Sequence, residues 1–532
     1  MSSSPATGAA PARPGSVSTA LAADRLGVPA VVFFVMSAAT PLTVVAGVIT
    51  LAFAITGLLA LPLAFLLIGA LLALFGVGYV AMSRHIANAG AFYAYISQGI
   101  GRPVGVGAAW VALLAYNLLQ VGLYGVIGAA AAPLLELWLG LSLPWWVIAL
   151  VAWLIVGILG LQQVDINGRV LAVLLCAEVA VILVFSLASL ANPADGAVSF
   201  ATLDPSGLFA AGIGALLALG VLGFVGFEAA TVFSEETKHP RRTVPIAMYT
   251  AIGIIALVYA LASWAMSVAV GPDEIATVAG EEEVDLIFNL AASHLGGVFA
   301  DIGYGLFLTS LLAAMIAFHN ITARYAFALG RERVLPAVFG RTSARSGSPK
   351  VGSLVQSAIG VAVILGYAIA GWDPLVQLFF WGGTSGGLGV LTLITLTAVA
   401  VLWFFFRDAR GENLWRRAVA PVLALLGLLV VLGLALAHFD VLLGVPADHP
   451  LRWGVPTGYL VVALLGIGWG MLLRRTRPQV YAGIGLGARA VTSGVTISAP
   501  RTGSAAASGA APAGEATGVR DEAEAERQEV RQ

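Results

Sequence analysis

The sequence predicts an all-α polytopic membrane protein, and three observations lead to that class. Apolar residues make up 59% of the 532-residue chain and charged residues only 10%, against about a quarter in a typical soluble protein. The apolar residues gather in long segments, and the basic residues gather in the connections on one side. A chain this apolar cannot form the surface of a water-soluble enzyme, and a net charge of −1 provides no basic surface for nucleic acid.

Twelve segments can each supply the roughly 20 apolar residues that a helix needs to cross the hydrocarbon core of a bilayer. We therefore expect residues 28–473 to form one twelve-helix membrane domain. Residues 1–27 and 474–532 have too few apolar residues to bury, and we expect two disordered cytoplasmic tails. The twelve segments are 28–52, 58–82, 105–131, 145–161, 168–190, 207–232, 244–270, 297–321, 350–370, 375–406, 418–437 and 453–473.

The connections between these segments predict the orientation of the chain. Of the 27 Lys and Arg residues, only Arg452 falls on the opposite side, where acidic residues such as Glu281 and Asp285 collect. Because basic connections stay in the cytoplasm, we expect both termini there and the chain in the plasma membrane. The single cysteine, Cys176, excludes a disulfide framework and a cysteine-based metal site, and we expect no cofactor.

Two of the twelve segments contain residues that interrupt a helix. The first carries Pro41 and Gly47 in its middle, and the sixth carries Gly226 shortly before Glu228. Proline removes a backbone donor and glycine weakens a helix, and non-helical backbone at membrane depth persists only where it faces protein or a wet cavity. Interrupted spans at matching places in two halves are typical of the binding site of an inverted-repeat transporter. The alternative is that these residues only permit close helix packing.

Three stretches resemble the amino acid–polyamine–organocation superfamily of permeases. Residues 79–95 are similar to the cytoplasmic loop that follows the second span of that family. Residues 224–228, followed by 235–240, are similar to its sixth span and the exit from it, and residues 320–336 are similar to the exit from its eighth span. The resemblance extends over about 28–473 and recurs in the same order along the chain.

This resemblance implies a five-plus-five inverted repeat with broken helices one and six. The repeats would cover about 28–190 and 207–406, and two extra helices would lie in about 418–473. The resemblance also implies that substrate binds between spans 1, 3, 6, 8 and 10, and that the chain carries out coupled or exchange transport of amino acids or related amines.

The candidate substrate-binding residues come from the two interrupted spans and from the third span. The N-terminus of a half-helix offers backbone N–H groups to a substrate carboxylate, and aromatic residues in the sixth span could gate the site. Packing within the bundle is the alternative role for each. The candidates are Thr40, Pro41, Leu42, Thr43, Gly47, Tyr116, Phe224, Gly226, Phe227 and Glu228.

Two acids within apolar spans, Glu178 and Glu228, are candidates for coupling transport to an ion gradient. Intramembrane acids are costly and indicate a functional site. The resemblance places Glu178 beside the first interrupted span, where some relatives carry a lysine. Glu178 could exchange a proton, coordinate Na⁺ or bind a substrate ammonium, and a helix–helix hydrogen bond is the structural alternative. Thr309 and Ser310 are candidate Na⁺ ligands because hydroxyl oxygens suit a hard cation.

The function predicted from these features is secondary active transport of amino acids or related amines by alternating access. Two buried acids favour a proton over Na⁺ as the coupling ion, and a zwitterionic amino acid is the preferred substrate. Sodium-coupled or exchange transport of a cationic amine or polyamine is the alternative, and a channel is the alternative of a different class. The sequence lacks a phosphate-binding loop of a nucleotide-driven pump. The expected partners are the small-molecule substrate, a proton or Na⁺, and membrane lipids.

Overall fold

The described part of the chain is built from helices. Its β pairing is confined to isolated bridges, one of which joins Leu26 and Thr237. Helices are favoured because every backbone N–H and C=O group in hydrocarbon must find a partner within its own segment. The computed structural model describes residues 21, 25–86, 88–162, 164–343 and 346–487.

The first half of the membrane domain contains the first five expected spans. The first span is divided into four helical pieces, and a short helix separates the second and third spans. The elements are α1 (Val28–Ala39), α2 (Pro41–Thr43), η1 (Val44–Ile49), α3 (Thr50–Thr56), α4 (Leu61–Ser83), α5 (Phe92–Gly99), α6 (Arg102–Leu139), α7 (Trp145–Gly160) and α8 (Val164–Ala191).

The second half begins with another divided span and ends with two further long helices. Two helices, α12 and α13, lie between its second and third spans. The elements are η2 (Ala201–Leu203), η3 (Pro205–Phe209), α9 (Ile213–Leu222), α10 (Ala229–Val232), α11 (Pro240–Val270), α12 (Ile275–Glu282), η4 (Glu283–Asp285), α13 (Leu286–Leu295), α14 (Gly297–Arg331), η5 (Ala337–Gly340), α15 (Lys350–Ala370), η6 (Pro374–Phe380), α16 (Trp381–Arg407), η7 (Trp415–Val419), α17 (Ala420–Ala437), α18 (Phe439–Leu443), α19 (Leu451–Thr476) and α20 (Pro478–Gly483).

Ten helices in the described part of the chain are long and apolar enough to cross a membrane. They coincide with ten of the twelve expected segments. The fourth and sixth expected segments contain the shorter apolar helices α7 and α9. The sixth is short because the span is interrupted after Leu222.

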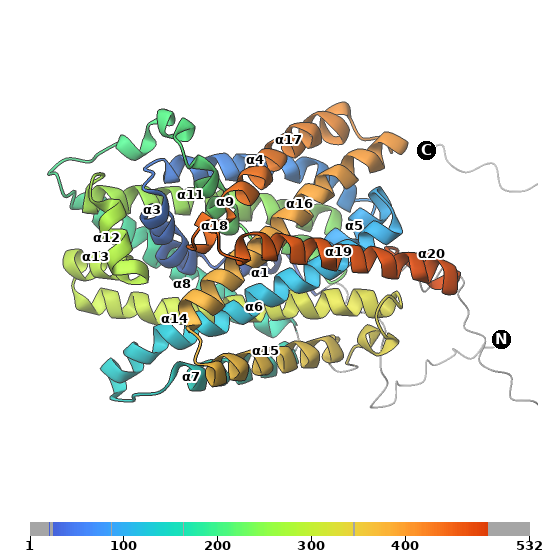
Figure 1. The fold of residues 1–532 in the computed structure, drawn as a ribbon, viewed down its shortest axis with the longest axis horizontal. Coiled ribbons are helices and arrows are strands. Elements are labelled where there is room, and N and C mark those ends of the chain that lie inside the picture. Colours follow the sequence, from blue (N-terminus) through green and yellow to red (C-terminus); the bar gives the residue numbers. More distant parts are fainter. Residues whose placement is uncertain (1–20, 22–24, 87, 163, 344–345, 488–532) are drawn as a thin grey trace, which may run out of the picture. The chain divides into compact units, whose positions relative to one another are not determined.

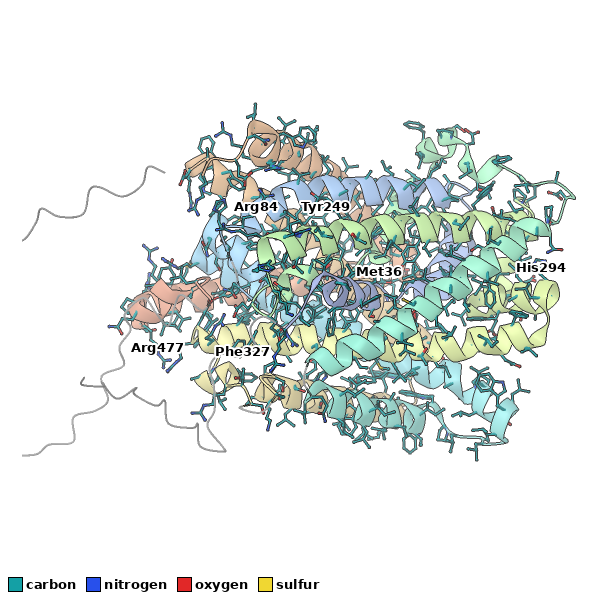
Figure 2. All side chains as sticks on the ribbon, turned by 180° about the vertical axis from the view of Figure 1, so that it is seen from behind. Met36, Arg84, Tyr249, His294, Phe327 and Arg477 are labelled. Carbon is teal, nitrogen blue, oxygen red and sulfur yellow. The ribbon has the colours of Figure 1, made fainter. Side chains whose placement is uncertain are left out.

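The bundle has two ends of opposite charge. In Figure 1, α12 and α13 lie at the left and α5 and α20 at the right. Figure 2 shows Arg84, Phe327 and Arg477 at one end, His294 at the other, and Met36 between them. We call the end with Arg84 and Arg477 the basic end. The opposite end, where the carboxylates of α12 and η4 lie, is the acidic end.

The interruption in the first span lies at Thr40, and not between Pro41 and Gly47 as the sequence predicts. Thr40 has left-handed backbone angles (φ 46°, ψ 66°). Pro41 begins the next helical piece, because proline disfavours a helical backbone at the residue before it and fits the first position of a helix. Gly47 lies inside the π-helical turn η1 and does not end it.

The interruption in the sixth span occupies residues 223–228, between α9 and α10. Gly226 has a φ of +114°, which glycine adopts without the strain that a side chain would bring. The chain here forms consecutive turns and resumes a helix only at Ala229.

The two expected tails are partly folded in the structure. Leu21 is buried against Ala89 and Phe327, so burial begins before the expected boundary at Val28. At the other end α19 continues past Arg474 and α20 follows it, and the chain stays packed as far as Gly487. The sequence prediction missed this because few apolar residues are involved. Residues 1–20, 22–24 and 488–532 of the expected tails lie outside the described residues.

Candidate functional site

The two interruptions touch each other in the middle of the bundle. A Cβ atom on Gly226 would lie 2.7 Å from Cβ of Ala38 and 3.0 Å from the nitrogen of Ala39. The backbone of the sixth span therefore approaches the backbone of the first span more closely than any side chain would permit. The carbonyl group of Ala39 accepts a hydrogen bond from the hydroxyl group of Tyr259 (2.9 Å), which supplies a partner where the helix stops.

A cavity of about 70 Å³ lies against this contact, on the side of the acidic end. The first span contributes Thr40 and Thr43 and then the apolar face of η1 and α3. Among the described residues, the cavity wall has no charged side chain. Spans 1, 3, 6, 8 and 10 form the cavity wall, which consists of Ala38, Ala39, Thr40, Thr43, Val44, Val48, Leu51, Leu119, Leu123, Leu222, Val225, Phe318, Phe379, Phe380, Gly383 and Thr384.

Glu178 of α8 lies directly behind the first interruption. Its Oε1 atom accepts hydrogen bonds from the backbone N–H of Leu42 (2.5 Å) and from the hydroxyl group of Ser310 (2.7 Å). Ser310 also lies 3.4 Å from the hydroxyl oxygen of Thr43. Glu178 is buried, and it thus joins the half-helix that begins at Pro41 to the eighth span. Its charge lies where the positive end of that half-helix would favour it.

Glu228 stabilises the second interruption. Its Oε2 atom accepts the backbone N–H of Gly226 (2.9 Å), and its Oε1 atom accepts the hydroxyl group of Tyr116 on α6 (2.6 Å). Its backbone carbonyl accepts the hydroxyl group of Thr231 (2.9 Å). Glu228 is fully buried and does not line the cavity. The sequence-predicted residues Tyr116, Gly226 and Glu228 are therefore one connected group.

The remaining sequence-predicted residues divide between the cavity and the surrounding core. Thr40 and Thr43 line the cavity, whereas Pro41, Leu42 and Gly47 do not. Phe224 and Phe227 point into the aromatic core, where their rings pack against Phe65 and Phe75. Thr309 donates to the carbonyl group of Leu306 on its own helix, whereas the hydroxyl group that bonds Glu178 is that of Ser310. The substrate-binding and Na⁺-binding roles that the sequence suggests for these residues stay predictions.

Sequence reasoning missed most of the apolar wall. One helix face of the first span carries Thr40, Val44, Val48 and Leu51. Since Thr40 was predicted to bind substrate, this spacing could have identified the three apolar residues as part of the same wall. The contributions of the eighth and tenth spans carry no comparable signal, because a phenylalanine in a membrane helix is usually packing or lipid contact.

The comparison with known proteins decides the family. Residues 30–475 match the sequence profile described as amino acid permease. The chain belongs to the amino acid permease family. It is therefore a polytopic membrane transporter and not an enzyme, and the resemblance predicted from the three sequence stretches is confirmed.

Individual relatives of this permease differ in their substrates. It is 25% identical to the branched-chain amino acid permease BcaP of Lactococcus lactis over 394 residues, which cover 68% of this chain and 78% of BcaP. It is 23% identical to the low-affinity putrescine importer PlaP of Escherichia coli over 347 residues, covering 64% and 72% of the two chains. It is 27% identical to the chloroplastic cationic amino acid transporter 7 of Arabidopsis thaliana, but it spans only 25% of that protein.

Two ion pairs lie on the basic side of the two interruptions. The guanidinium group of Arg324 on α14 binds both carboxylate oxygens of Glu236 (2.6 and 3.0 Å), and Arg331 binds both oxygens of Glu235 (2.7 Å each). Arg324 and Glu236 are buried. The two ion pairs connect the end of the eighth span to the exit of the sixth span.

Glu332, which follows α14, lies buried in a group of donors at the basic end. Its oxygens accept hydrogen bonds from the side chains of Asn88 and Tyr93 and from the backbone N–H groups of Gly485 (2.6 Å) and Gly487 (2.7 Å). Burial raises the pKa of Glu332 above its usual value, although these donors act in the opposite direction. The loop after the second span is thus joined to residues 478–487, which we call the C-terminal segment.

Proposed function

We propose that this permease is a secondary active transporter that carries an amino acid with an apolar side chain through the cavity between the two interruptions. The observation that carries the proposal is the cavity itself, which is bounded by both helix breaks and by spans 3, 8 and 10. Interrupted helices provide backbone groups for the charged ends of a substrate. A packed span without a break would offer none.

The composition of the cavity wall favours a substrate with an apolar side chain over one with a cationic side chain. Its polar side chains are the hydroxyl groups of Thr40, Thr43 and Thr384, and the rest of the wall is apolar. The two nearby acids are directed elsewhere, since Glu178 binds the amide of Leu42 and Glu228 binds Tyr116. A second ammonium group in this cavity would lack a carboxylate, and its desolvation would be costly.

We also propose twelve membrane crossings in two inverted repeats of five, followed by two extra helices. The breaks fall in the first helix of each proposed repeat, which supports this arrangement. The basic end would face the cytoplasm, because the basic connections lie there. The cavity then faces the outside of the cell while the ion pairs of Arg324 and Arg331 close the inside.

Coupling to a proton through Glu178 is the most specific part of the proposal. The carboxylate bonds the first free amide of the half-helix that begins at Pro41, so a change in its charge acts directly on the break. Deprotonated Glu178 would hold the half-helix in place, and protonation would weaken that bond. Na⁺ bound by Glu178 and Ser310 is the alternative, since both supply oxygen ligands.

Uptake into reconstituted vesicles tests the proposal. Purified protein should accumulate leucine or valine under an inward proton gradient, and lysine and putrescine should compete poorly. Glu178→Gln keeps the acceptor oxygen for Leu42 and Ser310 but cannot release a proton. It should abolish accumulation while equal-pH counterflow continues.

The matched control for this experiment is Glu136→Gln, which makes the same chemical change at an exposed position and should leave accumulation unchanged. Accumulation by Glu178→Gln equal to that of the parent would exclude the coupling role. Uptake that requires Na⁺ in the parent would favour the sodium alternative, and preferential uptake of putrescine would exclude the apolar substrate.

A further inference from the structure

A second, larger cavity lies at the basic end, far from the substrate cavity. It measures about 830 Å³ and is formed where α5, α16, η7 and α17 meet. These helices lie close together at the same end of the bundle in Figure 1. Most of its wall is apolar, including Leu402, Phe406 and Val422, and two guanidinium groups, from Arg407 and Arg417, complete it.

The two arginines of this cavity have no acidic partner among the described residues. The acidic groups nearby are used by other arginines: Glu412 pairs with Arg84 and Arg416, and Asp408 pairs with Arg410. The guanidinium group of Arg407 lies over the ring of Trp403 at 5.5 Å. Within the described part of the chain, no hydrogen bond from the side chain of Arg417 is formed.

The apolar part of the cavity is open to the surroundings of the bundle. Phe406 is 80% exposed and Trp403 is 48% exposed. Tryptophan and arginine together at the end of a membrane helix are typical of the boundary between hydrocarbon and headgroups. The cavity therefore combines two arginines that can bind an anion with an apolar trough that can hold hydrocarbon. It lies at the boundary where a lipid has both an anionic headgroup and the start of its acyl chains.

We propose that this cavity, which Arg407 and Arg417 line, binds one anionic phospholipid of the leaflet that the proposed orientation makes cytoplasmic. Guanidinium groups suit phosphate because they offer paired N–H donors, and the phosphate of the lipid supplies the missing negative charge. The acyl chain covers the apolar trough. A free phosphate would leave that trough bare, which is why the occupant is a lipid. Basic pockets between membrane helices on this side are suited to such headgroups.

The bound lipid would connect parts of the permease that belong to different repeats. Ile100, which follows α5, and Val399 of α16 both line the cavity. The other end of α16 supplies Gly383 and Thr384 to the substrate cavity. Occupation by lipid therefore stabilises the basic end of a helix that contacts substrate.

Native mass spectrometry and thermal unfolding of the purified permease test this proposal. Phosphatidylglycerol is compared with phosphatidylcholine of the same acyl chains and with inorganic phosphate. We expect the parent to retain phosphatidylglycerol selectively and to be stabilised by it. Arg407→Gln or Arg417→Gln should weaken retention about fivefold each, and the double variant roughly 30-fold.

Two further variants make the test specific. Arg416→Gln removes the same charge one residue away from Arg417, outside the cavity wall, and should change retention less than about twofold. Ala418→Trp fills the trough and keeps both arginines, and it should also abolish selectivity. Equal retention of the two lipids by the parent, or unchanged retention by the double variant, would overturn the proposal. Equal stabilisation by inorganic phosphate would overturn the assignment to a lipid.

Discussion

Replacing Gly226 by alanine should separate the two interruptions that bound the substrate cavity. A Cβ atom there meets Cβ of Ala38 at 2.7 Å and the backbone carbon of Ala38 at 2.8 Å. Backbone cannot move aside as the end of a flexible side chain can. The overlap costs about 1–3 kcal/mol, and the φ of +114° adds strain of about 1–3 kcal/mol for a residue with a side chain.

The combined cost of about 2–6 kcal/mol disfavours the closely packed state by a factor of roughly 30 or more. Uptake into reconstituted vesicles should fall by at least that factor, while size-exclusion chromatography still gives a folded monodisperse protein. Gly47→Ala is the matched control. Its Cβ atom would lie 3.9 Å from the nearest atom, Cε1 of Phe379, which is an ordinary contact, and uptake should be unchanged. Normal uptake by Gly226→Ala would refute the reasoning.

Three further outcomes are expected. Glu236→Ala leaves the buried guanidinium group of Arg324 without its carboxylate partner and should lower the free energy of unfolding by about 3–5 kcal/mol, measured by denaturant titration in detergent; a loss below about 1 kcal/mol would show that the pair contributes little to the stability of the protein. The amides of Gly485 and Gly487 lower the pKa of Glu332, which the rest of its surroundings would still bury without them. Binding of the C-terminal segment therefore favours the carboxylate and releases a proton, so protection of the segment against hydrogen exchange, corrected for the intrinsic pH dependence of exchange, should strengthen as the pH rises and weaken as it falls; Glu332→Gln should remove this dependence. Cysteines placed at the exposed residues Glu281 and Arg341 of a cysteine-free chain should be labelled from outside and from inside the cell, respectively, and labelling of both from one side would contradict the proposed orientation.

The long helices and the two ends of the bundle could be predicted from the sequence. The membrane selects apolar segments for its interior and keeps basic connections on one side, whichever helices pack together. Both features can therefore be predicted without knowledge of the contacts between helices. The limits of each helix were less predictable. Thr40 leaves the helix because Pro41 follows it, whereas Gly47 continues in a π-helical turn that no residue pattern specifies.

The site was predictable in its position and much less in its contacts. Pro41 and Gly226 indicated where the backbone opens, and the family resemblance placed Glu178 beside the first break. That Glu178 accepts the amide of Leu42, or that Phe224 turns away from the cavity into the core, depends on contacts between residues more than a hundred positions apart. Local pattern carries no information about such contacts.

The position of the C-terminal segment affects where the chain can be shortened or extended. A truncation after Thr476, where the last long apolar helix ends, would be the natural choice from hydropathy. It would remove the amides of Gly485 and Gly487 and leave Glu332 buried with acceptors unsatisfied, at a cost of about 1–3 kcal/mol. A protease site or affinity tag placed after Gly487 keeps both amides, so the shortest stable permease should end there and not at the membrane boundary.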